Sequence, residues 1–193
     1  MKGCRPITKE EQKKILAALN IRDRTLFILG MTTGFRISEL LSIKIQDVYE
    51  NGEIVEKVYV RRAYVKKKTA GRCVKLNKQA QKAIEELIEY YKKKKTFKLD
   101  WPLFQSQKDR SKPVTRQQIS NIFYKLKKEL HLTGKLNTHS LRKTFADRMY
   151  KVLDKDLFKL QRALAHESIN STVKYLSFKE EEIDEAIEKI FEV

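Results

Sequence analysis

The chain has 193 residues, enough to bury a sizeable core in one domain or two small ones, and we expect one domain. Its formal net charge of +17 exceeds what solubility requires and predicts a polyanionic partner. Nucleic acid is favoured over a membrane, because the sequence has neither a continuous apolar span nor a signal peptide after Met1. Cys4 and Cys73 are too few for a disulfide framework and lack zinc-site spacing, so we interpret both as incidental thiols of an intracellular protein.

Three helices are predicted before residue 45. Thr8 and Glu11 form a capping box that begins a helix from about residue 8 to 19. A largely apolar second helix ends near Gly34, and a shorter third helix covers residues 37–43. Arg36 therefore lies at the break between the second and third helices.

Between residues 53 and 76 the sequence changes to short runs of β-branched and aromatic residues, at 54–60, 64–65 and 73–76. These runs predict a small three-stranded antiparallel sheet. The connection before the last run is the segment KTAG, which begins at Lys68 and ends in a glycine that supplies the backbone freedom of a turn. Lys68 is therefore expected at an exposed hairpin end.

The rest of the chain is predicted to be helical apart from one long loop. Asn77 caps a helix to about Lys92, and residues 97–113, with two prolines and many polar residues, form the loop. Further helices are expected at about residues 116–130, 140–150, 156–165, 171–176 and 180–191. The expected fold is a mostly α-helical α+β domain, with the late polar motifs, including Tyr175, on helices.

Two segments carry arginines suited to binding phosphate. The segment TTGFRISELLSI contains Arg36, whose planar guanidinium can donate two parallel hydrogen bonds to one phosphate. The structural alternative is an arginine paired with Glu39 on a surface helix. The segment THSLRKTFA places His139 and Arg142 three residues apart on one helix face, so both can converge on one phosphate. In the structural alternative, His139 is merely a residue at the start of the helix and Arg142 is part of the basic surface.

A third segment, LAHESINSTVKYL, places Tyr175 nine positions after His166. Together the three segments resemble the tyrosine recombinase (phage integrase) family, and the resemblance runs from about Thr8 to Leu176. Two departures from the usual family pattern, Lys143 for a histidine and Ala165 for a glycine, leave the catalytic set intact. The resemblance implies the catalytic residues Arg36, Lys68, His139, Arg142, His166 and Tyr175.

The catalytic lysine is chosen among three neighbours, Lys66, Lys67 and Lys68. In the family this lysine lies in the β-hairpin, often directly before a threonine with a basic residue soon after, and Lys68 with Thr69 and Arg72 fits that form. Lys67 is the alternative. Further DNA contacts, or merely solvated cations, are expected at Arg61, Arg62, Lys66, Lys67, Arg110, Lys112 and Arg116, and at the lysines of the helix after Thr115.

The resemblance implies a covalent 3′-phosphotyrosine on Tyr175, with His139 as the base and Lys68 as the acid for the departing 5′ hydroxyl. Because this intermediate keeps the phosphodiester energy for rejoining, neither ATP nor a metal cofactor is expected. A metal site would have to combine His131, His139 and His166 with scattered carboxylates, none at the spacings that zinc or iron sites favour.

The resemblance covers only a catalytic domain, residues 1–178, and the family's customary N-terminal core-binding domain is expected to be absent. The chain is then either an excised fragment or a minimal recombinase similar to the fimbrial phase-switching enzymes. Residues 179–193 carry seven acidic residues against two lysines, with apolar side chains at helical spacing. This helix is expected to pack either on its own domain or on a neighbouring protomer of a synaptic tetramer.

The expected partner is double-stranded DNA, and the protein is expected to be cytoplasmic and encoded by a bacterium or a phage. Two other functions stay open: a non-cleaving DNA-binding regulator with the same fold, and a type IB topoisomerase-like enzyme that relaxes DNA as a monomer. The intact residue set argues against the regulator. The apolar side chains of the tail favour recombination over the topoisomerase.

Overall fold

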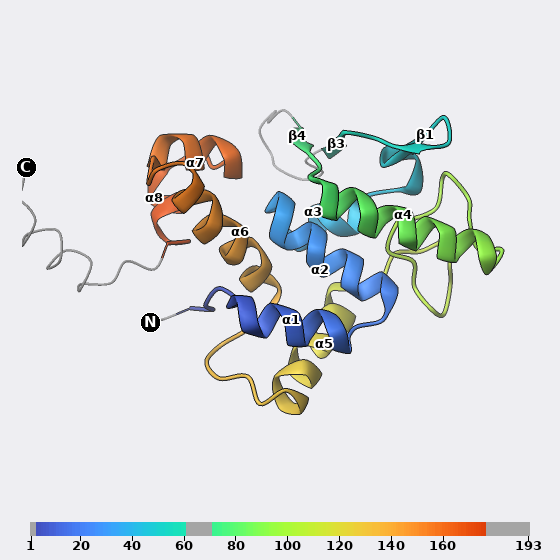
Figure 1. Ribbon diagram of the computed structural model, residues 1–193, viewed down its shortest axis with the longest axis horizontal. Helices are drawn as coiled ribbons and strands as arrows, with labels where there is room; N and C mark the ends of the chain where they lie inside the picture. Colours follow the sequence, from blue (N-terminus) through green and yellow to red (C-terminus); the bar gives the residue numbers. More distant parts are fainter. Residues whose placement is uncertain (1–2, 61–70, 177–193) are drawn as a thin grey trace, which may run out of the picture. The chain divides into compact units, whose positions relative to one another are not determined.

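The computed structural model describes residues 3–60 and 71–176. The chain divides into two compact units, Met1–Phe145 and Ala146–Val193. The helices are α1 (Lys9–Ala18), α2 (Ile21–Thr33), α3 (Ile37–Ser42), the 3-10 helix η1 (Ile45–Asp47), α4 (Lys78–Lys93), α5 (Arg116–Glu129), α6 (Thr138–Val152), α7 (Leu157–Leu164) and α8 (Ile169–Val173) (Figure 1). The strands are β1 (Tyr49–Glu50), β2 (Glu53–Ile54), β3 (Lys57–Val60) and β4 (Arg72–Lys75). Within the described ranges, no helix is both long and apolar enough to cross a membrane.

Local capping groups begin the helices of the first unit where the sequence predicts them. The Thr8 hydroxyl accepts a hydrogen bond from the Glu11 backbone N–H at 3.2 Å, and the Glu11 carboxylate accepts one from the Thr8 N–H at 3.0 Å. Asn77 caps α4 in the same way. Helix α2 ends at Gly34, whose φ of 62° is the left-handed conformation that glycine adopts without steric cost. Arg36 follows this turn and is the N-cap residue of α3, as predicted.

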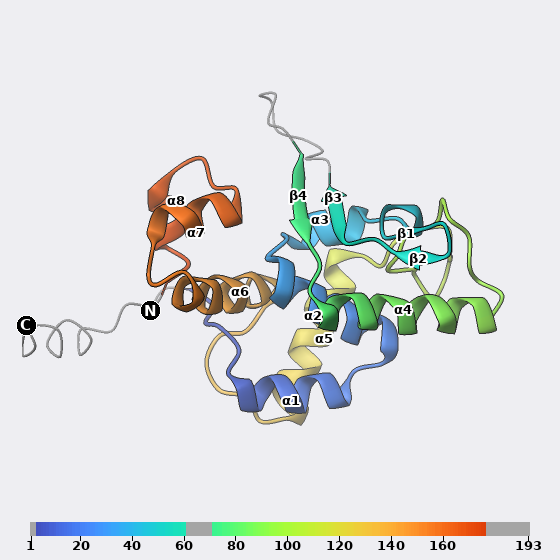
Figure 2. The same cartoon turned by 45° about the horizontal axis from the view of Figure 1, so that its top comes forward.

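Small antiparallel sheets are present as predicted, but the first predicted run, residues 54–60, is divided between two of them: Ile54 belongs to the β1–β2 pair and residues 57–60 form β3, which pairs with β4. The β1–β2 hairpin turns through Asn51 and Gly52, whose φ angles are 51° and 90°. An Asn-Gly pair favours such a tight hairpin because both turn residues need positive φ. Ile54 therefore pairs back with Tyr49 and does not extend the next sheet. The second sheet pairs β3 with β4 (Figure 2), and the predicted run at residues 64–65 lies outside the described residues.

Helices α2 and α4 lie side by side in both ribbon views and share the core of the first unit (Figures 1 and 2). The Thr25 hydroxyl on α2 donates to the backbone carbonyl of Ala83 on α4 at 3.0 Å. Burial of one large apolar side chain contributes about 1.5–3 kcal/mol, so this face is a main source of stability. The apolar side chains that recur at helical spacing along α4 are all buried: Ala80, Ala83, Ile84, Leu87, Ile88 and Tyr91.

Two glycines allow α6 to approach the end of α2 closely. Gly30 and Gly34 are four residues apart and face Leu141 and Phe145, which are also four apart. A Cβ atom at Gly30 would lie 2.8 Å from Leu141 Cδ1, and one at Gly34 would lie 2.3 Å from Phe145 Cδ1. Residues at this spacing share a helix face, so the two pairs interlock. The contact positions the first turns of α6 against the turn that carries Arg36.

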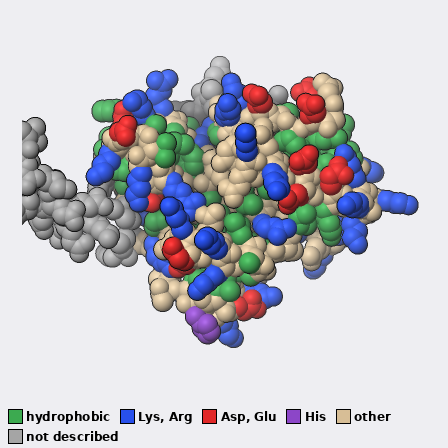
Figure 3. Space-filling view, in the orientation of Figure 1, with side chains coloured by type: hydrophobic (Ala, Val, Ile, Leu, Met, Phe, Trp, Pro, Cys, Tyr) green, Lys and Arg blue, Asp and Glu red, His purple; other side chains and the backbone are tan. Residues whose placement is uncertain are grey.

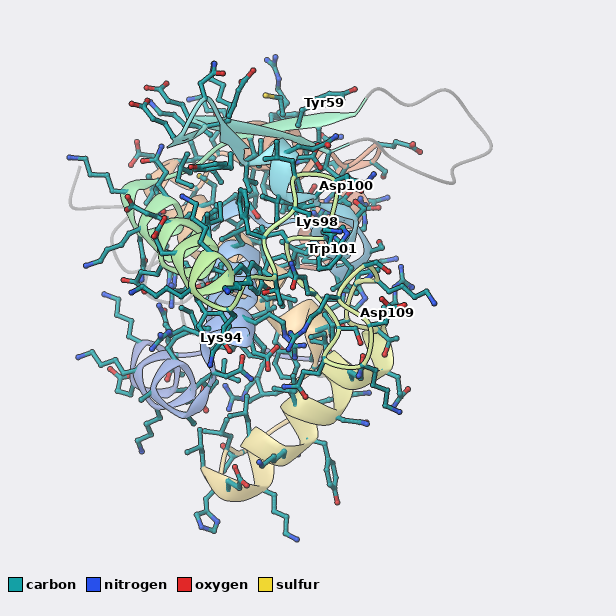
Figure 4. The ribbon with its side chains drawn as sticks, turned by 90° about the vertical axis from the view of Figure 1, so that its right-hand side faces the viewer. Tyr59, Lys94, Lys98, Asp100, Trp101 and Asp109 are labelled. Atoms are coloured by element: carbon teal, nitrogen blue, oxygen red, sulfur yellow. The ribbon has the colours of Figure 1, made fainter. Side chains whose placement is uncertain are left out.

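The loop after α4 contains no helix or named strand, as the sequence predicts for residues 97–113. Figure 4 shows Lys98 and Trp101 together in this loop, with the Lys98 ammonium 4.8 Å from the centre of the indole ring. Phe97 packs edge-on against Tyr49 with ring centroids 5.6 Å apart. Cation–π and edge-to-face contacts of this kind add to the isolated backbone bridges Lys44–Pro102 and Gln105–Pro113 in holding this irregular segment.

The second unit contains the end of α6 together with α7 and α8. Among its described residues, Ala146, Leu160, Leu164 and Thr172 are buried. Helix α8 ends at Val173, so the predicted helix through residue 176 is wrong at its end, and Tyr175 lies in a turn after the helix. The cause is a tightening of the backbone, since the Tyr175 N–H bonds to the carbonyl three residues earlier at 2.9 Å.

Candidate active site

The described residues place the predicted catalytic side chains in two groups, one in each unit. Arg36, His139 and Arg142 belong to the first unit, and His166 and Tyr175 belong to the second. The remaining catalytic candidate and four predicted DNA contacts lie outside the described residues: Lys68, Arg61, Arg62, Lys66 and Lys67.

Arg36 is oriented by the carboxylate of Glu39. The Arg36 backbone N–H donates to Glu39 Oε2 at 2.6 Å, and its Nη1 donates to Glu39 Oε1 at 3.2 Å. The Glu39 side chain is 8% exposed, whereas that of Arg36 is 36% exposed. The ion pair of the structural alternative is therefore present. It also holds the guanidinium at a fixed position where solvent, and hence an anion, can reach it.

Two further arginines bind the carboxyl end of α2, directly before Arg36. Arg142 is buried and donates from Nη1 to the backbone carbonyl of Gly34. Arg72, also buried, donates from Nη1 to the same carbonyl at 3.2 Å and from Nη2 to the Thr33 carbonyl at 2.7 Å. The Arg72 guanidinium also lies 5.0 Å from the centre of the Phe35 ring. The negative end of the α2 dipole thus attracts the guanidinium groups of Arg72 and Arg142, which lie beside the turn of Arg36.

His139 lies in the first turn of α6, three residues before Arg142, where the sequence predicts it. Shielding from solvent lowers the pKa of its imidazole, and the charges of Arg142, Arg36, Arg116 and Lys143 lower the pKa further. Arg36 and Arg142, the two predicted catalytic arginines of the first unit, thus both act electrostatically on His139. A lowered pKa keeps the His139 ring neutral at neutral pH, which a general base requires.

The second group joins His166 to Tyr175. Their ring centroids are 5.1 Å apart at an angle of 44°. His166 follows Ala165, whose left-handed φ of 49° ends α7, and Gln161 holds the His166 backbone through two hydrogen bonds of 3.1 Å. His166 Nδ1 lies 3.0 Å from the Thr172 hydroxyl. The last histidine therefore lies between two helices and not on one, with its ring against the ring of the tyrosine.

The other predicted DNA contacts are on the surface of the first unit. Arg116, the first residue of α5, is exposed and acts on the pKa of His139. Lys112 pairs with Asp109 at 3.2 Å in the loop, with Arg110 between them in the sequence. Figure 3 shows Lys and Arg side chains spread over the displayed face, with acidic side chains among them. Residues 3–60 and 71–176 contain no cluster of three or more metal-ligating side chains.

Sequence reasoning missed the contacts of three residues that shape these groups, Gly30, Arg72 and Thr172. The close approach at Gly30 had a signal, the Gly-x-x-x-Gly spacing with Gly34, which brings helices together when the glycines share a face. The contacts of Arg72 and Thr172 had no signal in the sequence alone, because a basic residue near a hairpin and a threonine on a short helix are common.

The fold is that of a tyrosine recombinase catalytic domain. The crystal structure of XerA recombinase matches with a TM-score of 0.74 and 22% identity, over 95% of this chain and 64% of that chain. The structure of the lambda integrase catalytic core matches with a TM-score of 0.62 and 20% identity, over 85% of this chain and 92% of that chain. A third match, the XerH site-specific recombinase bound to palindromic difH substrate in a post-cleavage complex, has a TM-score of 0.70 and 26% identity. It covers 98% of this chain and 54% of that chain.

Residues 5–182 match the Phage integrase family, and the chain belongs to that family. It is 32% identical over 182 residues to the probable integrase/recombinase YoeC of Bacillus subtilis (strain 168), covering 94% of this chain and 91% of that protein. It is 29% identical over 191 residues to the tyrosine recombinase XerC of Caldanaerobacter subterraneus subsp. tengcongensis, covering 95% of this chain. The chain spans 50% of the length of this XerC.

Proposed function

We propose that the protein is a site-specific DNA recombinase that cleaves and rejoins strands through a covalent 3′-phosphotyrosine on Tyr175. The observation that carries the proposal is the pairing of His166 with Tyr175 in one unit and the grouping of Arg36, His139 and Arg142 in the other. Membership of the Phage integrase family supports the same chemistry. The XerH relative was solved with its DNA substrate after cleavage, which supports double-stranded DNA as the partner.

In the proposed reaction the Tyr175 oxygen attacks the phosphorus, and the bond from phosphorus to the 5′ oxygen breaks. A phenol with a pKa of about 10 is rarely ionised at neutral pH, so its deprotonation costs about 4 kcal/mol. His139, neutral because of its lowered pKa, takes the phenolic proton, and Lys68 gives a proton to the 5′ oxygen. Rejoining reverses these steps, so the proposed cycle needs neither ATP nor a metal cofactor.

The two arginines and His166 stabilise the charge that develops on the phosphate oxygens. A preorganised donor of this kind contributes about 3–4 kcal/mol, so three donors exceed the cost of ionising the phenol. Arg36 is preorganised by Glu39, and Arg142 by the Gly34 carbonyl. Affinity for DNA comes from the net charge of +17 and is expected to fall steeply with salt, because phosphate contacts release counterions.

Two further parts of the proposal concern location and assembly. We propose that the protein acts in the cytoplasm and that residues 179–193 pack on a neighbouring protomer when copies assemble on DNA as a tetramer. Removal of the residues after Lys179 is then expected to weaken assembly without changing covalent cleavage by single protomers. Recombination by the truncated protein at an unchanged rate would refute the role of the tail.

The cleavage step is tested with a pool of nicked suicide duplexes of randomised sequence. The full chain is incubated with the pool, and covalent complexes are isolated under denaturing conditions and sequenced. Wild-type protein is expected to trap one family of sequences, and Tyr175→Phe is expected to trap none. A wild-type protein that binds the pool and forms no adduct would favour a DNA-binding regulator. Release of supercoils by monomers would favour a topoisomerase-like enzyme.

A further inference from the structure

We infer that Thr172 is a positioning residue that fixes the tautomer of His166, by donating its hydroxyl hydrogen to Nδ1 of the imidazole. The inference rests on the proposed function of His166 as a phosphate donor. Thr172 Oγ1 lies 3.0 Å from His166 Nδ1, and Thr172 is fully buried on α8. Either atom can supply the hydrogen of such a bond, so its direction has to be argued from the surroundings.

Three other buried or half-buried threonine hydroxyls of the helices, those of Thr32, Thr33 and Thr144, use a different partner. In each, the hydroxyl donates to the carbonyl four residues earlier, as expected for threonine within a helix. For Thr172 that carbonyl belongs to Ser168, which accepts instead from the Ser171 N–H at 3.1 Å. Among the described residues, the structure gives the Thr172 hydroxyl one hydrogen-bond partner, the imidazole of His166.

This single partner decides the direction of the hydrogen bond. If Nδ1 carried the hydrogen, the hydroxyl hydrogen of Thr172 would be buried without an acceptor, which is unfavourable. If the hydroxyl donates to Nδ1, its hydrogen is satisfied and only oxygen lone pairs are unused. The second arrangement has the lower free energy. It requires Nδ1 of His166 to be without a hydrogen.

A neutral imidazole carries one N–H group, so acceptance at Nδ1 places that hydrogen on Nε2. His166 can then donate from Nε2 to a phosphate oxygen without first being protonated. Gln161 holds the His166 backbone at both its N–H and its carbonyl, and the His166 side chain contacts the Thr172 hydroxyl and the ring of Tyr175. Thr172 thus supplies the orientation and the tautomer, and His166 makes the contact.

The tautomer is tested on the full chain without DNA, by long-range proton–nitrogen correlation NMR of protein labelled at histidine. Spectra are recorded at about two pH units above the ordinary histidine pKa of about 6.5, and His166→Gln assigns the His166 signals. Wild type is expected to show hydrogen on Nε2 alone. Thr172→Val, which keeps the side-chain shape, is expected to mix the tautomers, and Thr172→Ser to restore one. Ser171→Ala, on the exposed side of α8, is the matched control.

Hydrogen on Nδ1 in the wild type, or an unchanged His166 spectrum in Thr172→Val, would overturn the inference. Because this measurement needs no DNA, its result is independent of whether the protein cleaves. A wild type with the Nε2 tautomer and no covalent adduct would refute the proposed function and leave the tautomer assignment intact.

The functional consequence is measured as the rate of covalent adduct formation with the pool of nicked suicide duplexes. Thr172→Val is expected to slow this rate about five- to tenfold, the factor that corresponds to one neutral hydrogen bond, and Thr172→Ser to restore it. In a His166→Ala background the same substitution is expected to cause no further loss, because its effect passes through His166. An equal loss in both backgrounds would make Thr172 a packing residue and overturn the inference.

Discussion

Substitution of Gly34 is predicted to damage the first unit through two separable effects. At its φ of 62°, an alanine costs about 1–2 kcal/mol relative to an ordinary backbone conformation. The new Cβ would also lie 2.3 Å from Phe145 Cδ1, and overpacking of a tight site costs about 1–3 kcal/mol more. We therefore expect Gly34→Ala to lower the free energy of unfolding by about 2–5 kcal/mol, out of the about 5–15 kcal/mol of a typical domain.

Gly52 supplies the matched control for this experiment. Its φ of 90° is also positive, but a Cβ there would meet no atom within 4 Å. Gly52→Ala should show the backbone cost alone, about 1–2 kcal/mol. The two variants are compared by denaturant unfolding of the full chain, and Phe145→Leu in the Gly34→Ala background should recover part of the loss. An equal loss in the two alanine variants would refute the close approach of α6.

Three further outcomes follow from the described contacts. Ala165→Gly should raise the free energy of unfolding by up to about 1 kcal/mol, because Ala165 has a φ of 49°, and a lower denaturation midpoint would contradict this. Arg72→Met should slow adduct formation at least tenfold although Arg72 is outside the catalytic set, because its two hydrogen bonds to carbonyls at the carboxyl end of α2 are lost. Arg24→Met, which removes an arginine from α2 itself, is the control. Because the pKa of His139 is lowered by folding, the unfolded chain binds its proton more tightly, so stability should fall as the pH drops below about 6.5. His139→Gln should weaken this pH dependence in denaturation curves, and an identical dependence would show that other groups cause it.

The sequence predicts the parts of the fold that local signals determine. The capping groups at Thr8, Asn77 and Thr115 begin helices where expected, because each satisfies N–H groups of its own first turn. The first predicted strand, residues 54–60, begins too early because the Asn51-Gly52 turn directly before it, a strong hairpin signal, was not taken into account; that turn pairs Ile54 with Tyr49. The position of Tyr175 after α8 depends on a local tightening that helical spacing does not reveal.

For the site too, the sequence predicts the features that nearby residues determine and misses those that depend on contacts between distant residues. Arg36 at a glycine turn and His139 three residues before Arg142 follow from nearby residues. The contacts that hold them do not, since Arg72 reaches carbonyls 38 and 39 positions away and Arg142 reaches one 108 positions away. Such contacts depend on how helices and strands pack, which no short segment of sequence encodes.

The central claim is that Tyr175 forms a covalent bond with DNA, and denaturing gel electrophoresis after incubation with the nicked duplex pool tests it most directly. Wild type should give a protein–DNA band that persists in denaturant and disappears on proteolysis. Tyr175→Phe should give none, whereas Tyr124→Phe, which removes the hydroxyl of a tyrosine that is 75% exposed on α5, should match the wild type. A band that survives Tyr175→Phe, or the lack of a band in the wild type under conditions where DNA is bound, would contradict the assignment.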